Sequence, residues 1–424
     1  MGLEFIAIAV LVVTVVLFIT EIIPLPVTAM LGALAMAFFG IIGYDQVFLG
    51  FSSDTFMLVT GMLIIGQAMV ESGILLKVGQ GLKTLALRNN GTTIGIVGSA
   101  VGGLSSVMSN TVITASVLPV IDSLVESSKG LLTKKGLYMA MGAAAVLGGN
   151  LTLVGSTPQL VVQGILESAN QATFDFFTLT KGGIPLFIIG IAYYAFIAPK
   201  LLGSTKENNE IENDIQVSKE KAEYSFSIKN SILTLGTLAV CIIAFMTGLL
   251  PVGVIAIMGA LFLIVARCIS LKSIARNVDW STVVILGGTI GLSAGIVDSG
   301  AAEMIAYWIV GLAGGESANP WIAFAAIICV TVILTNIMSN TAIAAIMMTM
   351  GIHLSLVLDI NVLAMAVGIV FAASICFMTP IGSPPMTLTL SGGYRFIDYA
   401  KVGAPLCILL TLSICLIVPL LYGF

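Results

Sequence analysis

Residues 108–117 read MSNTVITASV and residues 338–347 read MSNTAIAAIM, so the same four residues open two largely apolar stretches. Hydroxyl and amide groups are costly to bury in hydrocarbon unless they are hydrogen-bonded. A single polar triplet in such a setting is unremarkable, but two copies in matching surroundings indicate a shared purpose. We therefore expect the two Ser-Asn-Thr triplets to have equivalent roles in the protein.

The sequence around these triplets is strongly apolar. Of its 424 residues, 58% are hydrophobic and 9% are charged, and the mean hydropathy is +1.11. Soluble domains carry about 25% charged residues. Apolar stretches long enough to cross a bilayer as helices recur throughout, beginning with 5–20, 22–42 and 55–70. Short alternating stretches typical of a membrane barrel are absent from the sequence. We therefore predict an all-α polytopic membrane protein.

The second half of the chain repeats landmarks of the first half in the same order. Most pairs lie 227 residues apart, the Met-Ser-Asn-Thr pair 230, and the last pair 220. The other paired landmarks are Pro24 with Pro251, Gly32 with Gly259, Gly61 with Gly288, 70–73 with 297–300, Gly155 with Gly382, and 181–186 with 401–406. Ordered self-similarity of this kind indicates an internal duplication. Residues 4–20 fall opposite 231–247, so we expect the first helix to be part of the repeat and not a cleaved signal peptide.

The duplication defines the predicted domain organisation. We expect a first repeat at 1–203, a polar cytoplasmic linker at 204–227 and a second repeat at 228–424. Within each repeat, a leading scaffold segment is expected to precede the segment that carries the polar triplet, which we call the transport segment by analogy with transporters built from inverted repeats. The predicted scaffold segments are 4–88 and 230–313, each ending in an interfacial helix at about 77–88 and 302–313, and the predicted transport segments are 92–201 and 319–424.

Each transport segment is expected to contain a re-entrant hairpin that turns at the Met-Ser-Asn-Thr stretch. A helix broken near Gly155 or Gly382 and a final spanning helix follow it. Each repeat then crosses the membrane five times, which inverts the second repeat relative to the first, as in many secondary transporters. With both termini outside, every Lys and Arg except Lys181 falls on the cytoplasmic side, as the positive-inside rule requires.

Hairpin tips and helix breaks leave backbone groups without helical partners, and in a membrane such groups must line a cavity or bind something. The chain offers four of these segments, at 109–111, 155–158, 339–341 and 382–385, and inverted repeats bring such segments together near the midplane. Neutral oxygen ligands suit a hard cation such as Na⁺, and helix N-termini suit an anion. No Lys or Arg lies inside a predicted span, so we expect the cation to supply the positive charge that the anion needs.

Other roles are open to individual polar residues. Isolated hydroxyls such as Ser105, Ser106 and Thr335 also join membrane helices by hydrogen bonds. An intramembrane enzyme with Ser109 or Thr111 as nucleophile needs a nearby base. The only histidine of the chain, at 353, lies far from both triplets in the predicted topology. A passive channel is a further alternative, which single-channel currents would reveal.

Most of the charged and aromatic residues are expected to have structural roles. The acidic candidates for a proton relay are Glu21, Glu71, Asp122 and Asp298. Glu71 and Asp298 precede Ser-Gly at equivalent predicted helix ends, which favours a capping or boundary role. The six cysteines show no metal or redox spacing, and His353 is expected to be a bystander near the outer surface. The tryptophans expected to anchor span ends at the membrane interface are Trp280, Trp308 and Trp321.

The paired Ser-Asn-Thr triplets, each followed by a Gly-Ser-[Thr/Pro]-Pro break, resemble the divalent anion–sodium symporter family of the ion transporter superfamily. The stretch GGYRFIDYAKVG at 392–403 is similar to the segment that follows the second break in that family. The resemblance covers essentially the whole chain. It implies an elevator-type, usually homodimeric carrier of dicarboxylates, citrate or sulfate that is commonly driven by Na⁺.

The same resemblance implies particular site residues. One Na⁺ site would use Ser105, Ser109, Asn110 and the carbonyl of Gly155. The second would use Thr335, Asn340 and the carbonyls of Met338 and Gly382. The anion would contact Asn110, Thr111, Asn340 and Thr341, in a pocket shaped by Ser156, Thr157, Ser383 and Pro384. The chain departs from the family pattern at Gln159 and Met386, where the family carries Asn after its proline pair, and at Thr157, where a proline is usual.

We therefore predict a secondary active transporter that moves a small anion, above all a C4-dicarboxylate, together with Na⁺ across the cell membrane. The alternatives within this fold are a Na⁺-independent anion exchanger and a carrier of sulfate or another inorganic anion. The substrate stays the least determined feature, because the departures from the family pattern fall where the anion would be held.

Overall fold

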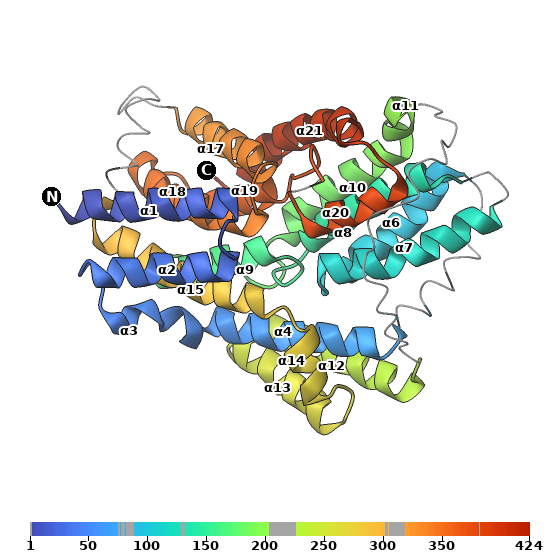
Figure 1. Ribbon diagram of the computed structural model, residues 1–424, viewed down its shortest axis with the longest axis horizontal. Helices are drawn as coiled ribbons and strands as arrows, with labels where there is room; N and C mark the ends of the chain where they lie inside the picture. Colours follow the sequence, from blue (N-terminus) through green and yellow to red (C-terminus); the bar gives the residue numbers. More distant parts are fainter. Residues whose placement is uncertain are drawn as a thin grey trace.

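A computed structural model describes residues 2–74, 89–128, 132–202, 226–301, 319–380 and 382–424, with isolated positions at 77, 81 and 304. Within these ranges the chain is built from helices and their connecting turns, and contains no β-strand (Figure 1). This confirms the all-α prediction. Nearly all of the predicted linker at 204–227, both predicted interfacial helices and Trp308 lie outside the described residues.

The helices of the two halves follow one another in the same order. The first half contains α1 (Leu3–Thr20), α2 (Leu25–Phe38), α3 (Tyr44–Val47), the 3-10 turn η1 (Leu49–Ser52), α4 (Asp54–Glu71), α6 (Asn90–Ser105), α7 (Asn110–Ser127), α8 (Lys134–Gly149), α9 (Thr157–Ser168), α10 (Thr180–Phe196) and α11 (Ala198–Leu202). The second contains α12 (Ile228–Thr247), α13 (Val252–Val265), α14 (Leu271–Asn277), α15 (Trp280–Asp298), α17 (Pro320–Thr335), α18 (Asn340–Leu358), α19 (Val362–Ala373), α20 (Pro384–Leu388), the 3-10 turn η3 (Thr389–Gly392) and α21 (Phe396–Tyr422). Among the described residues, α4, α12, α15, α18 and α21 are long and apolar enough to cross a membrane.

Matching residues start and stop the matching helices. Pro24 and Pro251 precede α2 and α13, where proline is tolerated because the first helical N–H groups have no intrahelical partner. Gly73 and Gly300 follow α4 and α15 with φ of +73° and +75°, a left-handed conformation that glycine adopts without strain. Both pairs lie 227 residues apart, at landmarks that the sequence repeats.

The helices that precede the polar triplets pack in pairs taken from opposite halves. Helix α4 packs along α13, and α15 packs along α2. Glycines allow both close approaches: a Cβ added at Gly61 would lie 2.5 Å from the backbone of Ala256, and one added at Gly288 would lie 2.8 Å from the backbone of Ala29. Because each half supplies one member of each pair, neither half completes this packing alone.

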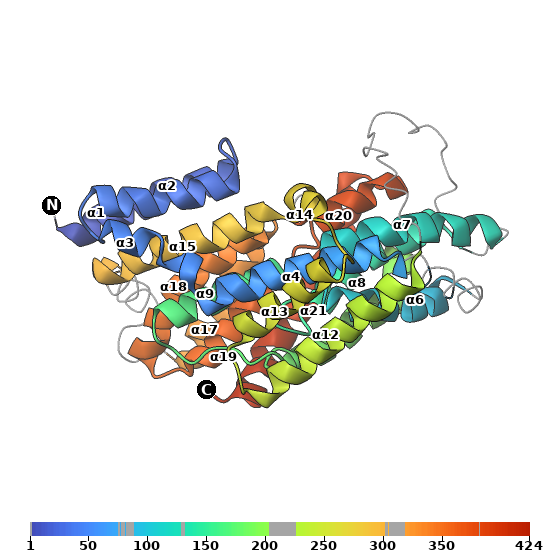
Figure 2. The same ribbon diagram turned by 90° about the horizontal axis from the view of Figure 1, so that it is seen from below.

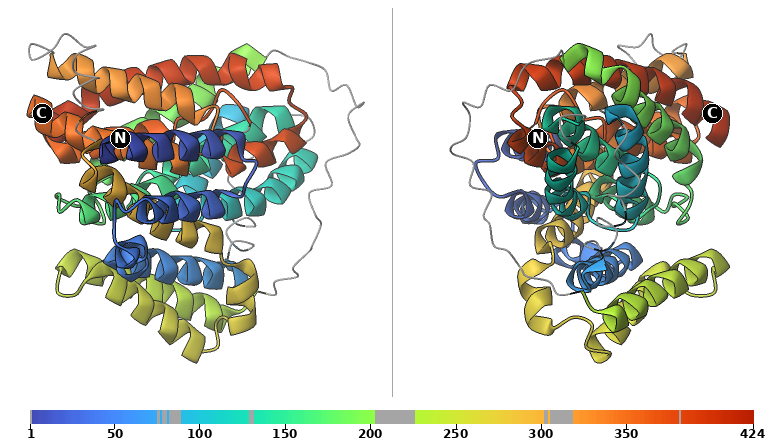
Figure 3. Two further views of the ribbon diagram at one scale, coloured as in Figure 1. Left: turned by 60° about the vertical axis from the view of Figure 1, so that its left-hand side comes forward. Right: turned by 90° about the vertical axis from the view of Figure 1, so that its right-hand side faces the viewer.

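A second group of helices surrounds the two triplets. It comprises α6 to α11 and α17 to α21, and Figure 1 shows α6 and α7 at the opposite end of the molecule from α17 and α18, an arrangement that Figure 2 repeats from below. In Figure 3, α12 and α13 lie with α4 at one edge of the molecule, away from α21. The two groups meet where α9 packs on α15 and α4, and where α18 packs on α15 and α1.

Four of the interruptions between helices of this second group fall at the stretches that the sequence predicts. Helix α6 ends at Ser105 and α7 begins at Asn110, and the same turn separates Thr335 from Asn340. Residues 150–156 separate α8 from α9, and residues 374–383 separate α19 from α20. These four interruptions supply the backbone that forms the site.

The α4–α13 contact generates a stability prediction. Gly61→Ala places a methyl group against the backbone of Ala256, and overpacking of this kind costs about 1–3 kcal/mol because a backbone cannot rotate away. We expect a lower temperature of thermal unfolding for the purified protein in detergent. Gly236→Ala on α12 is the matched control, since nothing lies within 4 Å of its added Cβ. Equal unfolding temperatures for the two variants would contradict this packing.

Candidate ion and anion site

The four interruptions meet around one cavity of about 310 Å³. Its lining contains all eight residues that the sequence predicts to contact an anion, namely Asn110, Thr111, Ser156, Thr157, Asn340, Thr341, Ser383 and Pro384. Of the predicted cation ligands, Ser109, Gly155 and Gly382 also line it. The structure therefore brings together residues that lie up to 275 positions apart in the printed sequence, from 109 to 384. Their roles stay predictions, but their proximity is observed.

In the first half, oxygen atoms converge on the amide of Asn110. The amide atom facing inward lies 2.6 Å from Ser105 Oγ, 2.9 Å from Gly155 O and 3.2 Å from Ala145 O. If that atom is Nδ2, it donates to all three oxygens. If it is Oδ1, it accepts a hydrogen bond from Ser105 Oγ at 2.6 Å and adds a neutral oxygen, of the kind that hard cations bind, to the two carbonyls. Either way, this cluster is built from neutral oxygen groups at a helix break.

In the second half, the equivalent amide has a different neighbourhood. Thr335 Oγ1 donates to Asn340 Oδ1 at 2.8 Å and lies 2.5 Å from Ala373 O, while Asn340 Nδ2 donates to Cys376 Sγ at 3.4 Å. A Cβ at Gly382 would lie 2.8 Å from Thr335 O, so this close approach needs glycine. Met338 is buried in the adjoining turn and donates its N–H to Leu334 O at 3.0 Å.

A matched hydrogen bond ties each hairpin tip to the break beside it. Thr152 Oγ1 donates to Ser106 O in the first half, and Thr379 Oγ1 donates to Asn336 O at 2.8 Å in the second. The two threonines lie 227 residues apart and the two acceptors lie 230 apart. Each bond satisfies a carbonyl that the end of a helix leaves free, so the tips and breaks are held in fixed relative positions.

Three helices begin at the cavity with unusual N-caps. Ser109, Ser156 and Ser339 are the N-cap residues of α7, α9 and α18, and none of their side chains makes a capping hydrogen bond. By contrast, serine N-caps outside the cavity lining accept capping hydrogen bonds, for example Ser53 on α4 and Ser227 on α12. The N–H groups of the first turns of α7, α9 and α18 are therefore directed at the cavity without a side chain of their own helix as partner.

Residues from the helices that precede each polar triplet complete the lining of the cavity. The sequence does not predict them. They are Leu25, Gln67, Asn277, Asp279, Ser281 and Thr282, among others. Asp279 is the only charged residue in the described lining. It caps α15 by accepting a hydrogen bond from Thr282 N at 3.4 Å, and it also accepts one from Thr282 Oγ1 at 2.6 Å. Most of these positions carry no duplicated signal: the residue 227 positions after Gln67, for instance, is Ala294.

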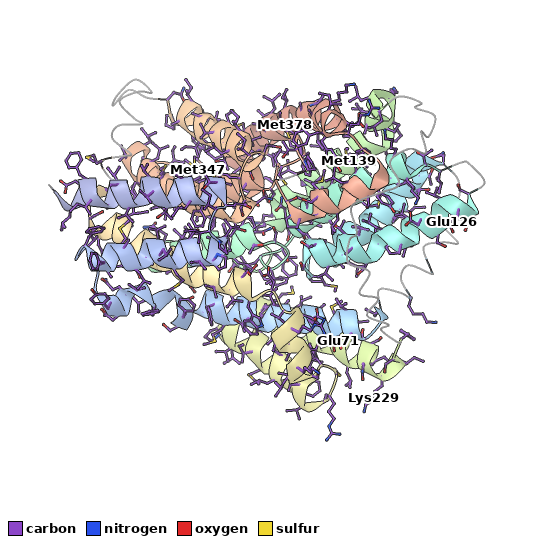
Figure 4. All side chains as sticks on the ribbon, viewed as in Figure 1. Glu71, Glu126, Met139, Lys229, Met347 and Met378 are labelled. Atoms are coloured by element: carbon purple, nitrogen blue, oxygen red, sulfur yellow. The ribbon has the colours of Figure 1, made fainter. Side chains whose placement is uncertain are left out.

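The acidic candidates for a proton relay all lie away from the cavity lining. Glu71 and Asp298 are the last residues of α4 and α15, which confirms the predicted helix ends. Glu71 accepts a hydrogen bond from Ser273 of α14, beside which it lies in Figure 4. Asp122 accepts from Tyr138 OH at 2.6 Å and pairs with Lys134 at 2.9 Å, and Glu21 ends α1.

Comparisons with known proteins identify the kind of protein that carries this site. Residues 15–368 match the family model described as citrate transporter. A sodium-dependent dicarboxylate transporter of Staphylococcus saprophyticus is 25% identical, over 88% of this chain and 78% of its own length. An uncharacterized transporter of Synechocystis is 21% identical, over 98% of this chain and 96% of its own. The fold resembles that of MtrF of Neisseria gonorrhoeae, described within a class of antimetabolite efflux pumps, with a TM-score of 0.55 at 11% identity, covering 89% of this chain and 83% of that one.

Apolar helices interrupted around a shared polar cavity, together with these relatives, define a multi-pass membrane transporter. Because the family model covers most of its length, the chain belongs to the citrate transporter family. This confirms the resemblance to divalent anion–sodium symporters. It also makes the chain a transporter and not the intramembrane enzyme considered above, since the family and its named relatives transport their substrates.

Proposed function

We propose that this protein is a secondary active transporter that carries a small anion, above all a C4-dicarboxylate, together with Na⁺. The observation that supports this most is the meeting of two Ser-Asn-Thr turns and two Gly/Pro breaks at one cavity whose polar groups are nearly all neutral. The named function of the Staphylococcus saprophyticus relative supports the choice of Na⁺ and of a dicarboxylate.

The proposed cation sites are the two clusters around the asparagine amides. The first would use Ser105, Ser109, Asn110 and the carbonyl of Gly155, where oxygens already converge within 2.6–3.2 Å of one amide atom. The second would use Thr335, Asn340 and the carbonyls of Met338 and Gly382. Unwound carbonyls at broken membrane helices are the ligands that transporters use for Na⁺. Bound Na⁺ would provide a positive charge beside the cavity.

The proposed anion site is the cavity itself. The first turns of α7, α9 and α18 direct N–H groups and the positive ends of the helix dipoles at it, and both attract an anion. Hydroxyl and amide groups of Asn110, Thr111, Ser156, Thr157, Asn340, Thr341 and Ser383, with Pro384, would contact the two carboxylates. A volume of about 310 Å³ is at the small end of ligand pockets, which suits a C4-dicarboxylate.

The proposed mechanism is alternating access by an elevator movement of inverted repeats. The arrangement of α6 and α7 at one end of the molecule and α17 and α18 at the other supports two hairpins that enter the membrane from opposite sides. The segments 92–201 and 319–424 would move against the scaffold segments 4–88 and 230–313. The linker at 204–227 would lie in the cytoplasm and both termini outside, and the carrier would be a homodimer in the lipid bilayer.

Ligand-dependent stability tests the cation and the anion together. A ligand that binds only the folded state raises its apparent stability by mass action. We expect succinate to raise the unfolding temperature of the purified protein in Na⁺ and to have little effect in K⁺. The comparison panel is citrate, sulfate and phosphate. Stabilisation by succinate that is equal in Na⁺ and K⁺ would favour the Na⁺-independent exchanger, and stabilisation by sulfate alone would favour the inorganic-anion carrier.

Transport by asparagine variants tests the assigned ligands. We expect Asn110→Ala and Asn340→Ala to reduce Na⁺-driven succinate uptake into proteoliposomes at least a hundredfold, because each removes a group proposed to contact both the cation and the anion. Asn319→Ala is the matched control, since its side chain only caps α17 through Trp321 N. It should transport at the native rate. A native rate in either site variant would refute the assignment.

A further inference from the structure

A buried hydrogen-bond bridge joins the helix breaks of the two halves. Ser374 Oγ lies 2.8 Å from Asn150 Oδ1 and 3.1 Å from Val370 O, so the amide oxygen is the nearer acceptor for its proton. Gln159 Nε2 donates to the same Asn150 oxygen at 3.1 Å. The exposed fractions of Asn150, Ser374 and Gln159 are 2%, 1% and 0%. Asn150 and Ser374 are the residues that follow α8 and α19, so they occupy equivalent positions where each helix is interrupted.

In the first half of the chain, the bridge is connected to the Asn110 cluster through Gly149. Gln159 Nε2 also donates to Gly149 O at 2.8 Å, which fixes the last carbonyl of α8. A Cβ at Gly149 would lie 2.6 Å from the Asn110 amide and 3.0 Å from Gly155 O, so this backbone packs directly against the proposed cation ligands. The bridge is therefore separated from the amide of Asn110 by the backbone of Gly149 alone.

In the second half of the chain, Ser374 lies between residues whose backbone and side chains hydrogen-bond to the Asn340 cluster. The carbonyl of Ala373 accepts from Thr335 Oγ1 at 2.5 Å, and the carbonyl of Ile375 accepts from Asn336 Nδ2 at 2.9 Å. Cys376 Sγ accepts from Asn340 Nδ2 at 3.4 Å. The backbone that holds the second cluster is thus the same backbone that presents the Ser374 hydroxyl to Asn150.

We propose that Asn150, Gln159 and Ser374 are positioning residues that couple the two cation sites, so that Na⁺ at one site favours Na⁺ at the other. This inference rests on the proposed function. A cation at the first cluster would fix Gly149 and Asn150, and the bridge would then fix Ser374 and its neighbours before the second cation arrives. The second ion would bear less of the entropy cost of ordering its break, which is positive cooperativity.

The experiment measures equilibrium Na⁺ binding to the purified protein by titration calorimetry without substrate, because uptake that needs two Na⁺ is sigmoidal even when the two sites are independent. The rate of succinate uptake into proteoliposomes is measured in parallel. The native protein should show a Hill coefficient for Na⁺ above 1 and up to about 2, the limit for two coupled sites. Ser374→Ala removes the bridging hydroxyl, and we expect its Hill coefficient to fall to about 1 with a rise of about fivefold in the half-saturating Na⁺ concentration. The maximal rate at saturating Na⁺ should change little, because no group that contacts the cation or the anion is removed.

Ser355→Ala is the matched control, because its hydroxyl is also fully buried but makes no hydrogen bond within the described residues. It should retain the native Hill coefficient. If Ser374→Ala does not fold, Ser374→Cys keeps the volume with a weak donor and should show the same loss. The rise of the unfolding temperature with Na⁺ concentration gives a second reading that requires no substrate, and it should be less steep in the Ser374 variants.

Two kinds of failure are distinguishable. A native protein whose uptake and stability both ignore Na⁺ would overturn the proposed symport and the coupling together. A native Hill coefficient of 1, or an unchanged value in the Ser374 variants, would overturn the coupling and leave the symport intact. An equal loss in Ser355→Ala would show a general packing effect, and would also overturn the role of the bridge.

Discussion

Backbone groups that leave a helix inside a membrane protein need new partners, and this requirement governs the structure. Within the second helix group, four of the non-helical segments lie at the cavity, in the stretches between α6 and α7, α8 and α9, α17 and α18, and α19 and α20. In lipid each exposed peptide group would cost several kcal/mol, so all four segments are turned inward. There they satisfy one another: the threonines at 152 and 379 bond to the hairpin tips, and the amides of Asn110 and Asn340 bond to the breaks.

The same requirement distinguishes polar side chains that cap helix ends from polar side chains that are available to a ligand. Where serine is the N-cap residue of a described helix outside the cavity lining, its side chain caps that helix, as Ser53, Ser227 and Ser270 do. The starts of α7, α9 and α18 are left without such caps although each has a serine at the capping position. A serine that is present but unused for capping leaves both its hydroxyl and the first-turn N–H groups for another partner. This contrast supports a ligand at the cavity more directly than the polarity of the residues alone.

Much of this arrangement follows from the sequence, because duplication doubles each weak signal. Pairs such as Gly61 with Gly288 or Gly155 with Gly382 are individually common, and their constant offset reveals the order of helices and the four interruptions. Contacts between helices from different halves carry no such signal: the packing of α4 on α13 and the lining residues Gln67 and Asp279 depend on tertiary structure. The Asn150–Ser374 bond was likewise hidden, because an amide and a hydroxyl at equivalent positions do not resemble each other.

The charge balance of the cavity decides how the proposed transport would be coupled. Its described lining holds one charged side chain, Asp279, which is occupied as the cap of α15, and no Lys, Arg or His. A dianion entering such a site alone would lose hydration and gain only partial charges from helix ends, which amount to about half an elementary charge each. Two bound cations would offset the remaining charge, whereas a fixed arginine would do so permanently. A permanent charge binds the anion whether or not Na⁺ is present, so a site made of neutral dipoles is the one that makes anion binding depend on the cation.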